Sequence, residues 1–325
     1  MTLVVMGIDA LDAELVSESV HPNLTLDTYS RISTIESATG ELSTHELWPT
    51  LITGLPPEEH GLTLDSGVGW ESPLLRFGGS LADFILPDGL QSKLGAWILN
   101  NTETDVFRTP ASYYPDHGLE TVFDGYDAEA IGIPNYVTDL DATDLEHELR
   151  RHLGELFERD SSQPGGHSSA DPDAFYEQAM EMVMVRLART RRAYRSNRFE
   201  LVFGYTSGVD LIGHIAYNDP QLQNRAYDET NEFVGELLSD LGADDTLVIV
   251  SDHGLRDGIH THQAMIASTE PRIVEAVDSV VDLRAALEAE LADGDHEPTP
   301  SEPHRESSID DESQVKEHLK DLGYM

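Results

Sequence analysis

The sequence predicts an α/β protein with a mostly parallel central sheet and helices on both faces. Three short aliphatic segments bounded by turn residues indicate buried strands: TLVVMGI (2–8), ELVFGYT (200–206) and TLVIVS (246–251). Two long helical patterns, at 171–197 and 219–242, each begin with an Asp-Pro pair and lead directly into the second and third of these strands. A helix followed by a strand, repeated, is typical of a parallel sheet covered on both sides.

The remaining segments define the expected domain. AEAIGI (128–133), which ends before Pro134, predicts a fourth strand. We expect one domain over residues 1–291, in which residues 65–125 form an irregular insertion or cap. Residues 292–325 are polar, acidic and rich in Pro and Ser, which predicts a linker that ends in a short helix, SQVKEHLKDLGYM.

The charge of the chain limits its partners and its compartment. There are 61 Asp and Glu residues against 20 Lys and Arg, a formal net charge of −41, and the acids are spread along the whole chain. This pattern favours a hydrated acidic surface in a cytoplasm of high salt, over a specific role in binding cations or a basic partner. Without a basic patch, we expect no nucleic-acid-binding surface.

Other classes of protein and site are excluded by what the sequence lacks. The chain has no cysteine, so disulfides, thiolate catalysis and cysteine zinc sites are excluded. No apolar run approaches the roughly 18 residues of a membrane span. The beginning, MTLVVMGIDALDAEL, has no basic region or cleavage site of a signal peptide. We therefore expect a cytoplasmic protein.

Carboxylate and imidazole residues follow three of the predicted strands. The first strand is followed by Asp9, the second by Asp210 and His214, and the third by a segment that reads SDHGLRDGIHTH (251–262). Because ligands bind beyond the carboxyl ends of strands in an open α/β sheet, these side chains are expected at one edge. Asp210 and His214 are four residues apart and would share one face of a helical turn.

These residue types indicate a metal site. Each residue alone has an ordinary explanation, such as a helix cap, a solvated helix face or a turn, and only their coincidence at one edge favours metal. Carboxylates and imidazoles without thiolates suit zinc, manganese or iron, and five or six ligands exceed the needs of one tetrahedral ion. The sequence therefore predicts two divalent metal ions, of the kind that clamp the attacking and leaving oxygens at phosphorus.

Such a reaction needs a nucleophile, and STHELWPTLITGLPPEEHGL (43–62) offers a hydroxyl. Ser43 or Thr44 is a suitable N-cap for the helix that follows. A hydroxyl there lies over the positive end of the helix, which also favours a phosphate. On local sequence alone, simple capping of the helix by Thr44 is the better explanation of the residue.

The order of these parts resembles the alkaline phosphatase superfamily, specifically its type I phosphodiesterase/nucleotide pyrophosphatase branch. The matching elements are a strand-end Asp, T-x(8)-TG-x-x-P-x-x-HG, D-x-x-x-H, S-DHG and G-x-H-x-x-x-A. The resemblance covers most of the chain outside residues 65–125 and the tail. SVVDLRAALEAEL (279–291) is similar to the closing strand and helix of that family.

The resemblance implies a role for each matching residue. Thr44 would be the nucleophile of a phosphate ester hydrolase and form a phosphothreonine intermediate. One metal, expected to be zinc with manganese as the alternative, would be held by Asp9, Thr44, Asp252 and His253. The other metal would be held by Asp210, His214 and His260, with His262 as the alternative to His260. His60 is expected to stabilise its loop instead of binding metal.

Departures from the family pattern affect the expected substrate. Nucleotide pyrophosphatases carry an asparagine three residues after the nucleophile, where this chain has Leu47, so specificity for nucleotides is not implied; His45 is an alternative phosphate contact. We expect a small phosphate ester, with phosphodiesters favoured. The alternatives are a phosphoglycerate-mutase-like or head-group phosphotransferase, a sulfatase-like hydrolase, which the lack of cysteine disfavours, and a metal-stabilised scaffold without catalysis.

Overall fold

The structure is a computed structural model that describes residues 1–37, 40, 42–63, 108–140, 149–150, 152–154, 156–159 and 167–294. Of the predicted insertion at 65–125, only 108–125 belongs to this part of the chain. Of the predicted tail, only 292–294 belongs to it. The predicted C-terminal helix lies outside the described residues.

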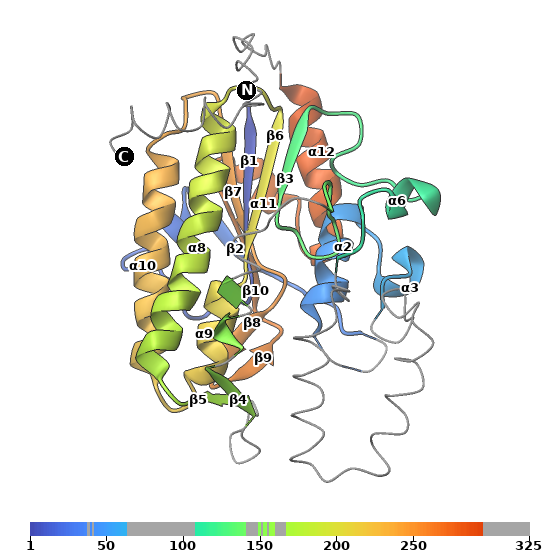
Figure 1. Ribbon diagram of the computed structural model, residues 1–325. Helices are drawn as coiled ribbons and strands as arrows, with labels where there is room; N and C mark the ends of the chain where they lie inside the picture. Colours follow the sequence, from blue (N-terminus) through green and yellow to red (C-terminus); the bar gives the residue numbers. More distant parts are fainter. Residues whose placement is uncertain are drawn as a thin grey trace, which may run out of the picture.

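Six strands form the central sheet, in the order β2-β10-β7-β1-β6-β3 (Figure 1). Their bounds are Leu3–Ile8 (β1), Thr28–Ile32 (β2), Ala128–Ile131 (β3), Leu201–Thr206 (β6), Thr246–Val250 (β7) and Ala264–Ser268 (β10). The central strand β1 pairs in parallel with β6 and β7, and β3 pairs in parallel with β6. Only β10 runs against its neighbours, β7 and β2. The predicted α/β class and mostly parallel sheet are confirmed, together with all four predicted strands.

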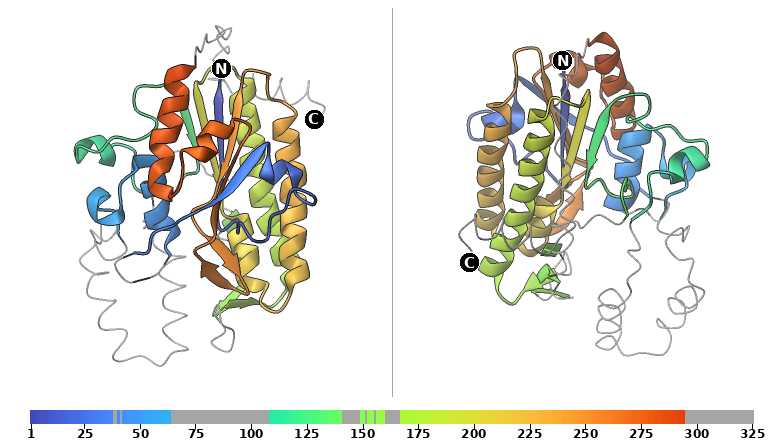
Figure 2. Two further views of the ribbon diagram at one scale, coloured as in Figure 1. Left: turned by 180° about the vertical axis from the view of Figure 1, so that it is seen from behind. Right: turned by 45° about the horizontal axis from the view of Figure 1, so that its top comes forward.

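Helices cover both faces of the sheet (Figure 2). One face packs against α1 (Pro22–Thr25), α8 (Pro172–Arg195), α9 (Gly208–Ile215) and α10 (Pro220–Leu238). The other packs against α2 (Thr44–Thr53), α11 (Pro271–Glu275) and α12 (Leu283–Asp293).

Alternation along β1 divides the core between these two faces. Leu3 and Val5 enter the cluster under α2 and α12, whereas Val4, Met6 and Ile8 enter the cluster under α8 and α10. All of these side chains are fully buried. A strand buried on both faces needs apolar residues at every position, which is why β1 is a continuous aliphatic run.

The two long helices begin at the predicted Asp-Pro pairs. The carboxylate of Asp171 accepts a hydrogen bond from the Ala174 amide at 3.1 Å, and that of Asp219 accepts one from the Leu222 amide at 3.2 Å. Proline at the next position costs nothing there, because the first amide of a helix has no partner within it. Each cap of this kind contributes on the order of 1 kcal/mol.

Two segments differ from the expectation. A hairpin of β4 (Phe157–Arg159) and β5 (His167–Ser169) lies just before α8, in a region where no strand is predicted. The strand expected within 279–291 is instead a single bridge from Ser279 to Ser33, followed by a 3-10 turn over Val280–Asp282 and then α12. A capping box, in which the Ser279 and Asp282 side chains bond each other's backbone amides, favours this turn.

The other short elements are α3 (Pro57–His60), α6 (Tyr113–Asp116), and the hairpin of β8 (Gly254–Arg256) and β9 (Ile259–Thr261). Among the described residues, no helix has the length and apolar character needed to cross a membrane.

Candidate active site

Polar residues converge at the carboxyl end of the three central parallel strands. Asp9 comes directly after β1, while α9 follows β6 after one residue and carries Asp210 and His214. Asp252 and His253 come directly after Ser251 at the end of β7. In Figure 1 this edge lies near α9 and the β8–β9 hairpin, at the opposite end of β1 from the N-terminus.

The first cluster brings four ligand atoms together. The Thr44 hydroxyl lies 3.3 Å from Oδ1 of Asp9 and 3.3 Å from Nε2 of His253. The same Nε2 atom is 3.5 Å from Oδ1 of Asp9 and 3.4 Å from Oδ2 of Asp252. The carboxylates and the imidazole are buried. The ligand atoms of this cluster thus lie around one position in space. Three of the side chains come from the ends of two strands, and the fourth comes from the start of a helix.

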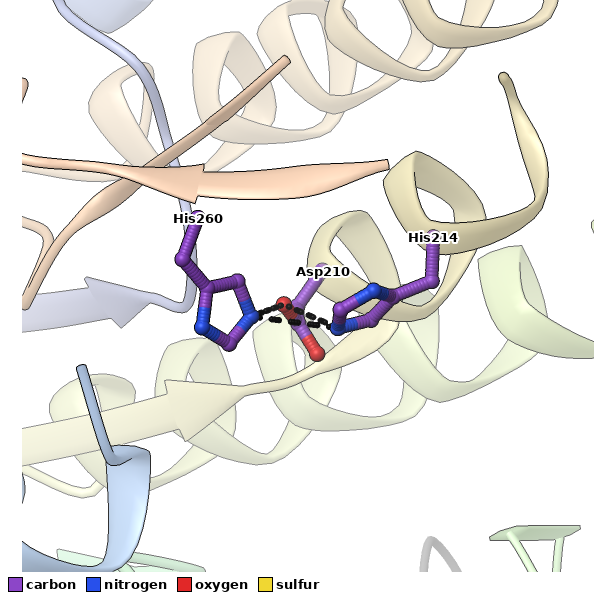
Figure 3. Close-up of side chains that lie close together, drawn as sticks. All are labelled: Asp210, His214 and His260. Atoms are coloured by element: carbon purple, nitrogen blue, oxygen red, sulfur yellow. Dashed lines mark hydrogen bonds and ion pairs between the residues drawn. The ribbon is translucent and has the colours of Figure 1, made fainter. Parts of the chain in front are cut away.

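The second cluster adjoins the first and is shown in Figure 3. Nε2 of His260 lies 3.1 Å from Nε2 of His214 and 3.3 Å from Oδ1 of Asp210, which is 3.4 Å from Nε2 of His214. The His260 ring also lies 4.1 Å from the His253 ring, centroid to centroid. The two clusters are therefore immediate neighbours.

The hydrogen bonds of the His253 and His260 rings leave the lone pair of each Nε2 atom available to a metal ion. Nδ1 of His253 lies 3.1 Å from the carbonyl of Gly254, and Nδ1 of His260 lies 3.1 Å from the carbonyl of Leu42. A carbonyl can only accept, so each Nδ1 must carry the hydrogen. A backbone carbonyl on the far nitrogen is the usual support for a metal-binding histidine.

Both clusters have the dimensions of a metal site. A tetrahedral ion with ligands about 2.0–2.1 Å away holds those ligands about 3.3 Å from one another. The observed separations between ligand atoms are 3.1 to 3.5 Å. Oδ1 of Asp210 and Oδ2 of Asp252 are buried and receive no hydrogen bond from the described residues. A buried carboxylate oxygen without a hydrogen-bond donor destabilises the folded protein, and a cation at each cluster would balance its charge.

The electrostatics of the site also favour cations. Burial, together with the charge of Asp210, raises the pKa of Asp9 to about 7. Burial and the neighbouring Asp9 raise the pKa of Asp252 well above its usual value. Burial opposes ionisation of Asp210, but His214 and His260 outweigh it and hold that pKa well below its usual value. Burial lowers the pKa of His253 to about 3, which keeps the imidazole neutral. Positive charge is thus needed before all three carboxylates can ionise together.

Thr44 does not cap its helix. Ser43 occupies the N-cap position without a side-chain capping bond, and Thr44 is the first residue of α2. Its hydroxyl turns toward Asp9 and His253 instead. Trp48, one turn later, lies against Gly7 of β1, where an added Cβ would be 2.3 Å from the indole ring. This close approach places the start of α2 at the sheet edge.

Three other residues singled out in the sequence lie outside both clusters or beside them. His262 is exposed, and its Nε2 is 2.8 Å from Glu36, away from the second cluster. Leu47 is buried in the core, where it cannot contact a phosphate. His45 is half-buried beside Thr44, and burial with the charge of Arg150 lowers its pKa to about 3.

His60 has a structural environment. Its Nδ1 accepts a hydrogen bond from the Leu62 amide at 3.1 Å, and its Nε2 lies 3.2 Å from the Glu46 carbonyl and 3.2 Å from the Thr50 hydroxyl. Burial lowers its pKa to about 4. With both ring nitrogens occupied by loop and helix groups, His60 lies outside both clusters.

Sequence reasoning missed two residues next to the clusters. Tyr205, on β6, donates a 2.6 Å hydrogen bond to Oδ2 of Asp9. Its alternation with Phe203 places both side chains on the same face of the sheet, but nothing in the sequence gives the partner of its hydroxyl. His167, on β5, packs edge-on against the His214 ring at 5.2 Å. It lies in a polar segment with no periodicity, so only the hairpin reveals its position.

Comparisons with known proteins identify the family of the chain. A family model described as type I phosphodiesterase / nucleotide pyrophosphatase matches residues 3–272. No curated protein sequence matches the chain.

The solved structures that match the chain are remote in sequence. A Pyrococcus horikoshii protein has 10% identity and a TM-score of 0.44, over 92% of this chain and 99% of its own. An alkaline phosphatase from the Antarctic bacterium TAB5 has 13% identity and a TM-score of 0.45, over 89% of this chain and 97% of its own. Murine ectonucleotide pyrophosphatase / phosphodiesterase 5 has 15% identity and a TM-score of 0.36, over 78% of this chain and 57% of its own.

The family match spans the first strand, the start of α2, α9 and the β8–β9 hairpin, and therefore every residue of the two clusters. With more than half of its length matched, the chain belongs to the type I phosphodiesterase/nucleotide pyrophosphatase family and is a phosphoric ester hydrolase.

Proposed function

We propose that the protein hydrolyses phosphodiesters with Thr44 as the nucleophile, through a phosphothreonine intermediate at a site for two divalent metal ions. The observation that carries this proposal is the position of the Thr44 hydroxyl, 3.3 Å from both Asp9 and His253 at the edge where the two clusters meet. A hydroxyl that served only to cap α2 would point at the helix amides instead.

The residues of the clusters divide into two sites. Asp9, Thr44, Asp252 and His253 would hold one ion, and Asp210, His214 and His260 would hold the other. Zinc fits the carboxylate and imidazole ligands and the tetrahedral spacing, and manganese is the alternative. When bound, the ions would lower the pKa of the Thr44 hydroxyl and neutralise negative charge on the phosphoryl oxygens.

The chain's own groups account for the positioning. The hydroxyl of Thr44 gives its proton to solvent and attacks phosphorus, while the bond from phosphorus to the leaving alcohol breaks on the opposite side. The departing oxygen takes a proton from solvent. Water then attacks the phosphothreonine, the bond between phosphorus and the Thr44 oxygen breaks, and the hydroxyl is restored. The first turn of α2 orients Thr44 and presents the positive end of the helix dipole to the phosphate.

The expected substrate is a small phosphodiester without nucleotide specificity. The position that carries a phosphate-binding asparagine in nucleotide pyrophosphatases is Leu47, which is buried. His45, beside the nucleophile, is the side chain that we propose contacts the phosphate in its place. The net charge of −41 further supports a working environment of high salt in a cytoplasm.

A single series of assays tests the proposal. The purified protein, stripped with chelator and reloaded with zinc or manganese in molar salt, should hydrolyse bis-(p-nitrophenyl) phosphate faster than the monoester. Thr44→Ala should lower kcat by about a thousandfold or more, whereas Thr44→Ser should retain measurable turnover. Rapid acid quench should trap a phosphoryl group on the peptide that contains Thr44.

Three results would argue against it. Full activity of Thr44→Ala would remove the covalent mechanism while leaving the enzyme class intact. Faster hydrolysis of the monoester would remove the diester preference. Binding of one metal equivalent per chain instead of two would contradict the proposed two-ion site.

A further inference from the structure

A proline interrupts the hydrogen bonding of the helix that carries Thr44. Pro49 lies inside α2, at the sixth of its ten residues. In an α-helix the amide of each residue bonds the carbonyl four residues earlier, and proline has no amide hydrogen. The carbonyl that loses its partner is therefore that of His45, the residue next to the nucleophile.

A side chain from a distant segment takes the place of the missing amide. Nδ2 of Asn135 donates a hydrogen bond of 2.8 Å to the His45 carbonyl, across 90 residues of sequence. Asn135 is buried, with 7% of its surface exposed. A carbonyl can only accept, so this contact fixes which end of the amide faces α2.

Asn135 is itself held by two further hydrogen bonds. Its Oδ1 accepts a hydrogen bond from the Thr109 hydroxyl at 3.1 Å, and its carbonyl accepts one from the Tyr114 hydroxyl at 2.8 Å. Its backbone has φ +57°, a left-handed conformation that asparagine tolerates better than most residues. Thr109 and Val137 are joined by a backbone hydrogen bond of 3.0 Å, which keeps the two segments together. The amide is thus presented to α2 by a rigid support.

We propose that Asn135 is a positioning residue for the nucleophile: it closes the hydrogen bond that Pro49 leaves open and so fixes the first turn of α2 with Thr44. This inference rests on the proposed role of Thr44. Two contacts of 3.3 Å place the Thr44 hydroxyl between Asp9 and His253, and its direction depends on the path of the backbone through residues 44 and 45. A shift of about 1 Å at a reacting group can cost on the order of a hundredfold in rate.

The role of Asn135 can be tested by removing its side-chain amide and then restoring the missing helix amide at position 49. Asn135→Gly keeps the positive φ and removes the amide, so kcat on bis-(p-nitrophenyl) phosphate should fall about 10- to 100-fold while KM changes less than about threefold. Pro49→Ala restores the missing helix amide and should by itself leave kcat nearly unchanged, because a carbonyl can accept two hydrogen bonds. The double variant should recover most of the lost kcat.

Further variants make the outcome decisive. Asn135→Asp has nearly the same shape and lacks the amide hydrogens, so it should reproduce the loss if Asn135→Gly folds poorly; circular dichroism and thermal unfolding identify that case. An unchanged kcat in both Asn135 variants, a change in KM alone, or a double variant no faster than Asn135→Gly would overturn the inference.

The inference and the proposed function fail in different ways. If Thr44→Ala keeps full activity, Thr44 is not the nucleophile, and Asn135 cannot act by positioning it. If Thr44→Ala is inactive while Asn135→Gly is as fast as the unaltered protein, only the positioning role is wrong.

Discussion

Tyr205 donates its phenolic hydrogen to Asp9 at 2.6 Å, and it does so from β6 to the end of β1 across 196 residues of sequence. The bond occupies Oδ2 of Asp9 and leaves Oδ1 facing Thr44 and His253. The Tyr205 ring is fixed in turn by an edge-on contact of 4.8 Å with Trp48 of α2. One tyrosine thus ties the strand that carries a proposed ligand to the helix that carries the proposed nucleophile.

Tyr205→Phe should keep the fold and weaken the metal site. The ring contact with Trp48 remains, but Asp9 loses the hydrogen bond that orients it, so affinity for the added metal should fall about 10- to 100-fold. Activity measured against free metal concentration gives this affinity. Tyr194→Phe is a matched control, because Tyr194 donates an equally short bond, 2.6 Å, to Asp245. Equal effects of the two substitutions would contradict the role of Tyr205.

Substitutions of His260 and His262 distinguish a proposed metal ligand from a nearby histidine that lies away from the cluster. His260→Ala should reduce bound metal from two equivalents toward one and lower kcat by about a hundredfold or more, because it removes a proposed ligand of the second ion. His262→Ala should change neither, since His262 contacts only the exposed Glu36 among the described residues. Elemental analysis after dialysis measures the stoichiometry. Loss of metal from the His262 variant would reassign the ligand.

Gly7→Ala should displace α2. The added methyl group would meet the indole of Trp48, and overpacking of this kind costs about 1–3 kcal/mol in the free energy of unfolding. Because Trp48 lies one turn after Thr44, kcat should fall as well. Gly204→Ala is the control: its methyl group would meet Thr190 of α8, on the opposite face of the sheet. The control should lose stability and keep kcat, and a matching loss of kcat would refute the link to α2.

His60 should make stability depend on pH. Its pKa is lowered by burial to about 4, against about 6.5 in an unfolded chain. Between these values the unfolded chain binds the extra proton, so stability falls as the pH falls from about 6.5 to about 4 and then levels off. The contribution of His60 amounts to about 3 kcal/mol.

Chemical unfolding at pH 7 and at pH 4.5, in constant molar salt, measures the effect. His45 and His253 also have lowered pKa values and contribute in the same direction, so the comparison needs a variant. His60→Gln should reduce the difference between the two pH values. An equal difference in both proteins would show that the pKa of His60 is not lowered in the folded protein.

Local sequence patterns predicted the central strands and the two long helices, because each of these elements depends on residues that are close in sequence. The aliphatic runs gave the central strands, and the Asp-Pro pairs at 171 and 219 gave the starts of the two long helices. The rule that parallel strands end at one edge of the sheet then predicts that Asp9, Asp210 and Asp252 lie together.

What could not be predicted depends on contacts between distant segments. The edge strand β2, with partly exposed residues, has no continuous apolar run, and His167 lies in a polar segment that only pairing with β4 organises. Pro49 indicates that the helix supplies no amide to the His45 carbonyl, but nothing in the sequence indicates that Asn135 is the donor. The preference for His260 over His262 came from the resemblance to the family, and the structure places His260 beside Asp210 and His214.

The central position of β1 has a consequence for biosynthesis. The first strand of the chain pairs only with β6 and β7, so Leu3 finds its partners at Leu201 and Thr246. On the ribosome, roughly the first two hundred residues must be made before β1 can enter the sheet. Closing such long loops is slow and exposes an aliphatic strand in the meantime. We expect the nascent chain to depend on chaperones, and a fragment that stops before β6 to aggregate without ever assembling a centre for metal or phosphate.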